Sequence, residues 1–235
     1  MANFHIALNP ALVAFANITA QDVRRAGVFL ICLVLAIGVH EFAHAWTAHK
    51  LGDRTPEAQG RLTLNPLPHA DPIGTLLLPV VLALSGTGML FGWGKPVETQ
   101  PRLYTRKMTM RGGMALVSFA GPLSNLLLAI ATFGVIAGLS AGGVITGRLD
   151  AFHPLRVFYS LNILLFVFNL IPVHPLDGGK ILAWFMGPKY QHVDDFLRRY
   201  GFLILVALIF MPPHLLSIIL GPFFRWGNLA LDLVL

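Results

Sequence analysis

Charged residues are scarce in this chain. Only 12% of its 235 residues are Asp, Glu, Lys or Arg, whereas a soluble domain carries about 25%. Hydrophobic residues make up 55% of the chain, and the mean hydropathy is +0.69. So few charges cannot cover a water-exposed surface, and so apolar a chain does not stay disordered. The composition excludes a soluble globular enzyme and a disordered protein, and it indicates an integral membrane protein.

Cysteine is nearly absent as well. Cys32 is the only one, which excludes an intramolecular disulfide and any Cys-rich zinc or redox motif. The net charge of +6 resembles a nucleic-acid signal, but the sequence has no basic stretch interleaved with aromatic residues. In a membrane protein, Lys and Arg in short cytoplasmic loops account for such an excess. We therefore expect the lipid bilayer, and no nucleic acid, as a partner.

Five apolar stretches approach the roughly 20 residues that a helix needs to cross the hydrocarbon core. Residues 4–18 are also apolar but short, and Pro10 interrupts them, which indicates an interfacial segment. We predict an all-α polytopic membrane protein with about five membrane-crossing or re-entrant segments. Residues 1–25 would form the N-terminal interfacial segment, 26–200 the membrane core, and 201–235 a C-terminal transmembrane helix and tail. The five stretches are Val28 to Ala48, Ile73 to Phe91, Met114 to Leu139, Val157 to Val173 and Phe202 to Leu220.

The first apolar stretch contains the pattern His40-Glu41-Phe42-Ala43-His44. Residues four apart share one face of a helix, so His40 and His44 can bind the same ion. Glu41 lies beside that face, where it can accept a proton from water activated by the metal. Ionisable groups at membrane depth cost roughly 2.5–3.5 kcal/mol each, and a divalent cation offsets that cost. The pattern predicts an intramembrane metal site.

A catalytic zinc ion typically takes three protein ligands, so a third polar side chain is expected at the same depth. Asp177 follows the fourth apolar stretch, where Pro172 and Pro175 end the helix and two glycines free the backbone to turn. We predict that Asp177 is the third ligand. Two alternatives remain open: Asp177 is a solvated loop residue, or His174 is the ligand instead.

These residues belong to a wider pattern that runs from about residue 36 to residue 182. The sequence resembles the site-2 protease family of intramembrane zinc metalloproteases. The resemblance implies one zinc ion held by His40, His44 and Asp177. It also implies that Glu41 is the general base and that Asn169 polarises the scissile carbonyl or holds substrate; an interhelical hydrogen bond is the alternative for Asn169. The further matching segments are Gly60-Arg61-Leu62-Thr63-Leu64-Asn65-Pro66, His69, Asp71-Pro72, Gly74-Thr75, Phe91-Gly92-Trp93-Gly94-Lys95-Pro96-Val97, Gly121-Pro122-Leu123-Ser124-Asn125 and Leu176-Asp177-Gly178.

The predicted zinc site constrains the topology. The two histidines and Asp177 each lie near the C-terminal end of an apolar stretch, so these two stretches must run in the same direction for the ligands to meet. Two stretches lie between them, so one of the two cannot cross fully. We predict that Ile73 to Phe91, with Pro79 and several glycines, enters the membrane and returns. Twelve of the 17 Lys and Arg then lie on one side, which predicts a cell-membrane protein with its active site toward the cytoplasmic face.

The sequence thus predicts a zinc metalloendopeptidase that hydrolyses peptide bonds in or near transmembrane segments of membrane proteins. A helical substrate hides its peptide bonds, so it must unwind before attack. Phe91 to Val97 offers an extended edge, a short re-entrant β edge, to which substrate could add as a strand; an ordinary glycine-rich loop is the alternative. A metal or proton transporter could use the same His, Glu and Asp cluster, but the internal repeat typical of many transporters is missing. The sequence leaves the substrate's identity and the oligomeric state open.

Overall fold

A computed structural model describes residues 18–84, 92–105, 108–210 and 215–235. Within these ranges the chain forms helices and connecting segments without a β-strand, so the prediction of an all-α protein is confirmed. Ala70 and Gly94 form an isolated antiparallel bridge. The helical elements are α2 (Ala20–Lys50), α3 (Thr55–Ala58), η1 (Leu67–His69), η2 (Pro72–Leu77, a π-helix), α4 (Leu78–Leu84), η3 (Pro101–Leu103), α5 (Met110–Ala141), α6 (Pro154–Asn169), α7 (Asp177–Met186), η4 (Pro188–Tyr190), α8 (Gln191–Phe210) and α9 (Leu215–Asp232).

Among the described residues, two helices, α2 and α5, are long and apolar enough to cross a membrane. The segments Pro72–Leu82 and Pro154–Asn169 are apolar but shorter. The last predicted stretch, 202–220, includes the end of α8 and the start of α9, and residues 211–214 between them lie outside the described ranges. The finer count of five membrane segments therefore stays a prediction.

Helix α2 begins at a capping box and extends through both predicted histidines. The Thr19 hydroxyl accepts a hydrogen bond from the backbone N–H of Asp22, and the Asp22 carboxylate accepts one from the backbone N–H of Thr19. This exchange satisfies N–H groups that the first helical turn leaves free. The helix therefore starts at Ala20, so the predicted boundary between residues 25 and 26 falls inside α2; residues 1–17 lie outside the described ranges.

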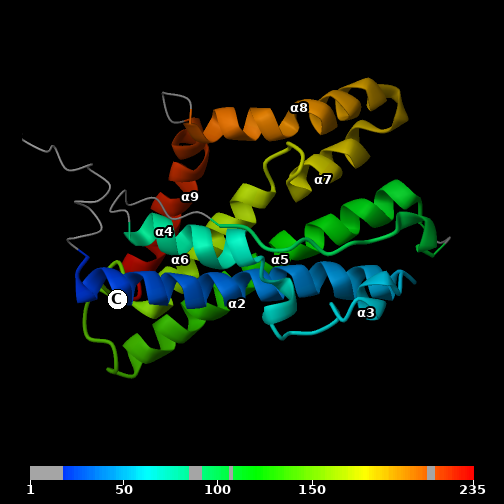
Figure 1. The fold of residues 1–235 in the computed structure, drawn as a ribbon. Helices are drawn as coiled ribbons and strands as arrows, with labels where there is room; N and C mark the ends of the chain where they lie inside the picture. Colours follow the sequence, from blue (N-terminus) through cyan, green and yellow to red (C-terminus); the bar gives the residue numbers. More distant parts are fainter. Residues whose placement is uncertain (1–17, 85–91, 106–107, 211–214) are drawn as a thin grey trace, which may run out of the picture.

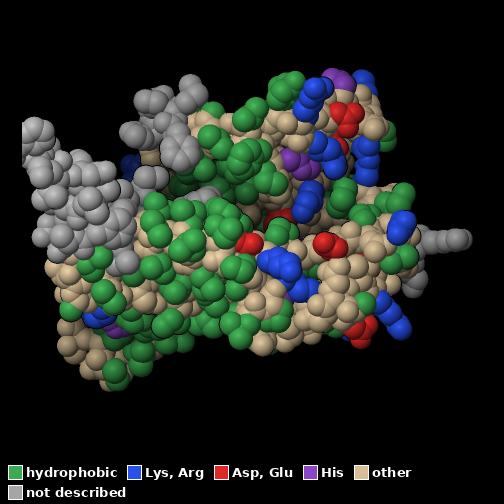
Figure 2. All heavy atoms as spheres, in the orientation of Figure 1, with side chains coloured by type: hydrophobic (Ala, Val, Ile, Leu, Met, Phe, Trp, Pro, Cys, Tyr) green, Lys and Arg blue, Asp and Glu red, His purple; other side chains and the backbone are tan. Residues whose placement is uncertain are grey.

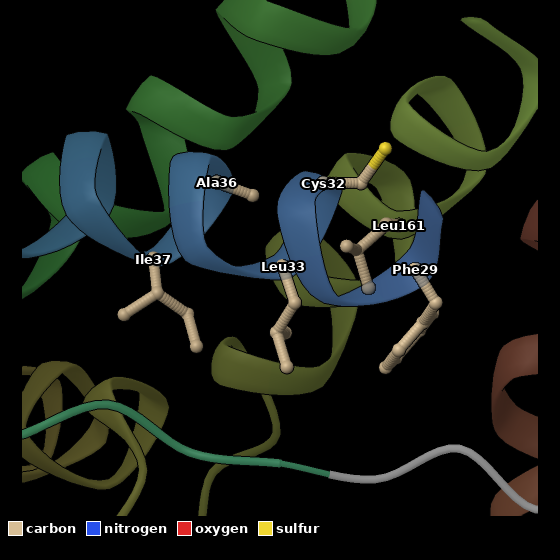
Figure 3. Packing of buried hydrophobic residues seen from close by; sticks show 6 residues of the cluster. All are labelled: Phe29, Cys32, Leu33, Ala36, Ile37 and Leu161. Carbon is tan, nitrogen blue, oxygen red and sulfur yellow. The ribbon is translucent and has the colours of Figure 1, made fainter. Parts of the chain in front are cut away.

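The apolar side of α2 packs against α6. Phe29, Leu33 and Ile37 form a buried cluster with Leu161 of α6, as Figure 3 shows. Ala36, in the same cluster, is fully buried, as are Ala45 and Ala48 further along the helix. Small residues let helices approach closely in lipid, where packing rather than water exclusion drives association.

Helix α5 is the centre of the arrangement. It packs against α2, α6 and α7, and α7 in turn packs against α8. Figure 1 shows α8 on the opposite side of the molecule from α2, with α7 and the start of α5 between them. The metal-binding residues predicted from α2 and α7 therefore meet directly beside the central helix.

The two ends of the predicted re-entrant stretch lie next to each other in the structure. It starts as η2 and α4, and residues 85–91 lie outside the described ranges. When the chain is next described, the backbone N–H of Trp93 donates to the carbonyl of Gly74 over 3.1 Å. A side chain at Gly74 would overlap the Trp93 indole, so glycine is required at this contact. The two ends of the stretch lie side by side.

Candidate metal centre

Three predicted ligands meet in the interior. The Nε2 atoms of His40 and His44 are 3.0 Å apart, and Oδ2 of Asp177 lies 3.3 Å from the first and 3.1 Å from the second. All three residues are buried. Zinc bonds of about 2.0–2.1 Å in a tetrahedron place neighbouring ligand atoms roughly 3.3 Å apart, so the three atoms match one face of a zinc site. The fourth position is left for water or substrate.

Gly121 of α5 makes room for this cluster. A methyl group there would overlap Nε2 of His44 and lie 2.7 Å from Nε2 of His40. Both atoms must keep their lone pairs free for a metal, and any side chain at position 121 would occupy the same space. A glycine is therefore required where α5 crosses the two imidazoles.

The outer nitrogens of the two imidazoles are held in different ways. Nδ1 of His40 lies 2.6 Å from Oδ1 of Asn125, and Nδ1 of His44 lies 2.7 Å from the carbonyl oxygen of Val117. Both partners are oxygens that only accept, so each Nδ1 carries the proton and each Nε2 presents its lone pair. This is the tautomer that a metal bound at Nε2 requires.

Asp177 reaches the cluster from a loop rather than from a long helix. It is the first residue of α7, and the preceding turn contains the cis peptide bond His174–Pro175. Gly178 and Gly179 pack directly on the backbone of this turn, where side chains would overlap carbonyl groups or approach them closely. The Lys180 ammonium lies 3.4 Å from Oδ1 of Asp177, on the side away from the imidazoles.

Glu41 is buried beside the cluster, and a returning segment holds it in place. The backbone N–H of Val97 donates to Oε2 of Glu41 over 2.8 Å. The segment before Val97 is fixed by Arg61, whose guanidinium donates to the carbonyls of Pro68 and Lys95. Burial lowers the pKa of Arg61 from its usual value. Arg61 therefore ties the segment that contacts Glu41 to the segment around Pro68.

The remaining predicted residues have hydrogen-bond partners outside the three-ligand group. Nε2 of His174, the alternative ligand, is bonded to Oδ1 of Asp194 at 2.9 Å instead of facing the cluster. The amide of Asn169 donates to the carbonyl of Leu165 in its own helix, so its catalytic role stays a prediction. The imidazole of His69 is fully buried and bonds the carbonyl of Thr63.

A family model described as Peptidase family M50 matches residues 28–208. The chain belongs to peptidase family M50. Two relatives bear names that call them putative zinc metalloproteases. YwhC of Bacillus subtilis is 37% identical over 204 residues, covering 85% of this chain and 86% of that protein. Rip2 of Mycolicibacterium smegmatis is 34% identical over 221 residues, covering 88% and 78%.

A more distant relative is the Regulator of sigma-E protease RseP of Escherichia coli, which is 27% identical over 126 residues, covering 52% of this chain and 28% of that protein. Solved structures offer no significant match. The M50 assignment confirms the predicted resemblance to intramembrane zinc metalloproteases, and the cluster of His40, His44 and Asp177 agrees with it.

This M50 chain has a polar cavity of about 300 Å³ whose lining includes Lys180, the residue paired with Asp177, but none of the three ligands. It lies between the start of α5, α7 and the start of α8, and Lys180 links its wall to Asp177. Figure 2 shows basic side chains gathered around a hollow in this part of the surface. The lining includes Arg111, Lys180, Trp184, Asp194, Asp195 and Arg198.

Several residues of the site had no predicted role. Asn125 and Gly121 fall in a segment that matched the family pattern, but nothing in their spacing pointed to the imidazoles. Asn162 touches Asn125 and belongs to no motif; its signal is an amide in the middle of a mostly apolar helix. The contribution of Val117 is a backbone carbonyl, which leaves no trace in the residue type.

Proposed function

We propose that this chain is an intramembrane zinc metalloprotease that hydrolyses peptide bonds in or near transmembrane segments of membrane proteins. The observation that carries the proposal is the triangle of ligand atoms from His40, His44 and Asp177, with sides of 3.0–3.3 Å, beside the buried carboxylate of Glu41. Membership of family M50 and the names of the relatives support the same chemistry.

The proposed reaction divides the work between the metal and Glu41. Zinc, when bound, supplies a Lewis acid that activates water and polarises the scissile carbonyl. Glu41 accepts the proton from the attacking water and passes it to the leaving amine. The Val97 N–H occupies Oε2 of Glu41, so we assign the proton transfer to Oε1. We retain Asn169 as a second residue acting on the carbonyl, as the family resemblance implies.

The substrate would bind along the free edge of the segment 92–97. The N–H of Trp93 and the N–H of Lys95 point toward the segment 69–74, where they donate to Gly74 and His69. Since backbone groups alternate along an extended segment, those of Gly94 point the other way. Among the described residues they have no hydrogen-bond partner. An unwound substrate can pair there, although Pro96 offers only a carbonyl.

The proposed topology places the zinc near the cytoplasmic face of the cell membrane. The meeting of Trp93 with Gly74 supports a stretch that enters and returns between them. The residue division into an interfacial segment (1–25), a protease core (26–200) and a C-terminal membrane helix with its tail (201–235) belongs to the same proposal. Water would reach the zinc through the polar cavity next to Lys180.

The test is cleavage of a model single-span substrate by purified full-length protein, with zinc measured on the same samples. Glu41→Gln keeps the shape of the side chain and removes the base. We expect zinc content to stay at the wild-type value while cleavage falls by about 10²–10⁴-fold, the usual contribution of a positioned acid–base group. Glu57→Gln, whose side chain is half exposed on α3, is the matched control and should leave zinc content and cleavage unchanged.

Undiminished proteolysis by Glu41→Gln would remove Glu41 from the mechanism. Metal flux across vesicles without any cleavage by the wild type would instead support a transporter.

A further inference from the structure

Three buried polar side chains form a chain of hydrogen bonds behind the metal site. Oδ1 of Asn125 lies 2.6 Å from Nδ1 of His40, and Nδ2 of Asn125 lies 2.8 Å from Oδ1 of Asn162. Nδ2 of Asn162 donates to the carbonyl of Phe158 over 2.8 Å. Both asparagines are fully buried, and they come from the apolar helices α5 and α6.

The direction of every bond in this chain follows from its last member. The Phe158 carbonyl can only accept, so the NH₂ group of Asn162 faces it and the amide oxygen of Asn162 faces Asn125. Asn125 must then turn its own NH₂ group toward Asn162, where it also meets the carbonyl of Ala36 at 3.3 Å. The oxygen of Asn125 is left facing His40, which puts the imidazole proton on Nδ1.

We propose that Asn162 is a positioning residue for the metal, acting through Asn125 to keep Nε2 of His40 unprotonated and aimed at the ion. The inference rests on the zinc site of the proposed function. Without an acceptor at position 162, only the longer 3.3 Å contact with the Ala36 carbonyl holds the Asn125 amide, which can then rotate and present its NH₂ group to Nδ1. The proton of His40 then moves to Nε2, the atom that the metal needs.

His44 provides a control inside the same site. Its Nδ1 donates to the backbone carbonyl of Val117, which no side-chain substitution removes. A change at Asn162 should therefore shift the tautomer of His40 and leave that of His44 as it was. A general loss of helix packing would instead shift the tautomers of both histidines.

Asn162→Leu breaks this chain of hydrogen bonds, called the relay below, because leucine has a similar volume and no hydrogen-bond acceptor. Asn162→Asp is the conservative variant, because a neutral carboxyl has its acceptor and donor where the amide has them, and burial favours the neutral form. Thr132→Val is the matched control on α5. Thr132 is buried and its hydroxyl bonds only the carbonyl of Leu128 in its own helix.

Two measurements on the full chain decide the matter. Competition with a zinc chelator should give about a tenfold weaker zinc affinity for Asn162→Leu, at the lower end of the range for outer partners of metal ligands. Asn162→Asp and Thr132→Val should bind as the wild type does. In zinc-free protein labelled with ¹⁵N-histidine, NMR should show the loss of the proton on Nδ1 of His40 in Asn162→Leu alone.

The relay is overturned if Asn162→Leu keeps wild-type affinity with the same His40 tautomer, or if both imidazoles shift together. Equal loss of affinity in Asn162→Leu and Thr132→Val also overturns it. If the leucine variant does not fold, Asn162→Ala takes its place under the same criteria. The NMR measurement needs neither zinc nor proteolysis, so failure of the relay is distinguishable from failure of the proposed function.

Discussion

The imidazoles and the carboxylate of the metal site are supported by two very different parts of the molecule. His40 and His44 lie four residues apart on α2, a single helix of 31 residues, and α5 holds both outer nitrogens. Asp177 instead starts a ten-residue helix after a turn, and the turn is tied to α8 through His174 and Asp194. The first part is set by the packing of long helices, and the second by close backbone contacts around a loop.

This difference indicates which features control zinc binding on each side of the site. On the imidazole side, the critical features are space and proton position, because the helix itself already fixes the spacing of the ligands. On the carboxylate side, the critical feature is the path of the backbone that carries Asp177. Substitutions on the two sides should therefore weaken zinc binding for different reasons and to different extents.

The largest effect should come from filling the space in front of the imidazoles. In Gly121→Ala the new methyl group overlaps Nε2 of His44, so we expect a loss of zinc affinity of more than about 100-fold, above the range for outer partners. Gly134→Ala is the matched control, because it lies on the same helix with no atom within 4 Å of the added carbon. Chelator competition on both variants measures the contrast, and equal affinities would refute the steric account.

A smaller effect is expected on the carboxylate side. In Gly178→Ala the added methyl group overlaps the carbonyl oxygens of Ile171 and Leu170, so the turn must shift. Overpacking of this kind costs about 1–3 kcal/mol, and we expect zinc affinity to fall about tenfold. Gly221→Ala on α9, with open space around the added carbon, should change nothing. A variant with normal zinc affinity would show that the turn moves freely without displacing Asp177.

The smallest effect should appear in the link to α8, and only above a certain pH. Asp194 lies on the charged first half of α8, ahead of the apolar run. Burial alone would raise the pKa of Asp194, but hydrogen bonds from His174 and Arg198 lower it by more. The pKa of Asp194 therefore lies below its ordinary value of 3.8. The ionised carboxylate therefore stabilises the fold above pH 3.8, and this contribution is lost as the pH falls through the folded-state pKa.

Asp194→Asn should consequently reduce the free energy of unfolding by about 1 kcal/mol at pH 6 and by less as the pH falls below 4. Thermal unfolding in detergent between pH 3 and 6 measures the difference between variant and wild type. Asp195→Asn, at the neighbouring position, serves as the control. A difference that stays constant over this range would mean that the charge of Asp194 contributes nothing.

The sequence predicted the imidazole side well, because a helix of constant pitch brings residues four apart to one face. It also predicted the end of α6 near Pro172 and the inward turn of Asp177. It could not predict that Asn125, rather than another polar residue of α5, meets His40, since that depends on how α5 is rotated against α2. Nor could it predict the contact of Val97 with Glu41, because a backbone N–H is present at almost every residue.

The strand-like edge shows the same limit. The segment 91–97 was predicted to be extended, and the structure describes residues 92–97 with an isolated bridge at Gly94 in place of a strand. Gly94 lies so close to α2 that a side chain there would overlap Ile37. Such an approach depends on tertiary packing and cannot be inferred from the local sequence.

The central claim is that one zinc ion is held by two imidazoles of α2 and the carboxylate of Asp177. X-ray absorption at the zinc edge, with the metal quantified per chain, tests it most directly on wild type and Asp177→Ala. We predict one zinc per wild-type chain with two imidazole nitrogens and oxygen ligands at about 2.0–2.2 Å, and far less than one per chain in Asp177→Ala. A variant that keeps the wild-type zinc content and coordination would contradict the account.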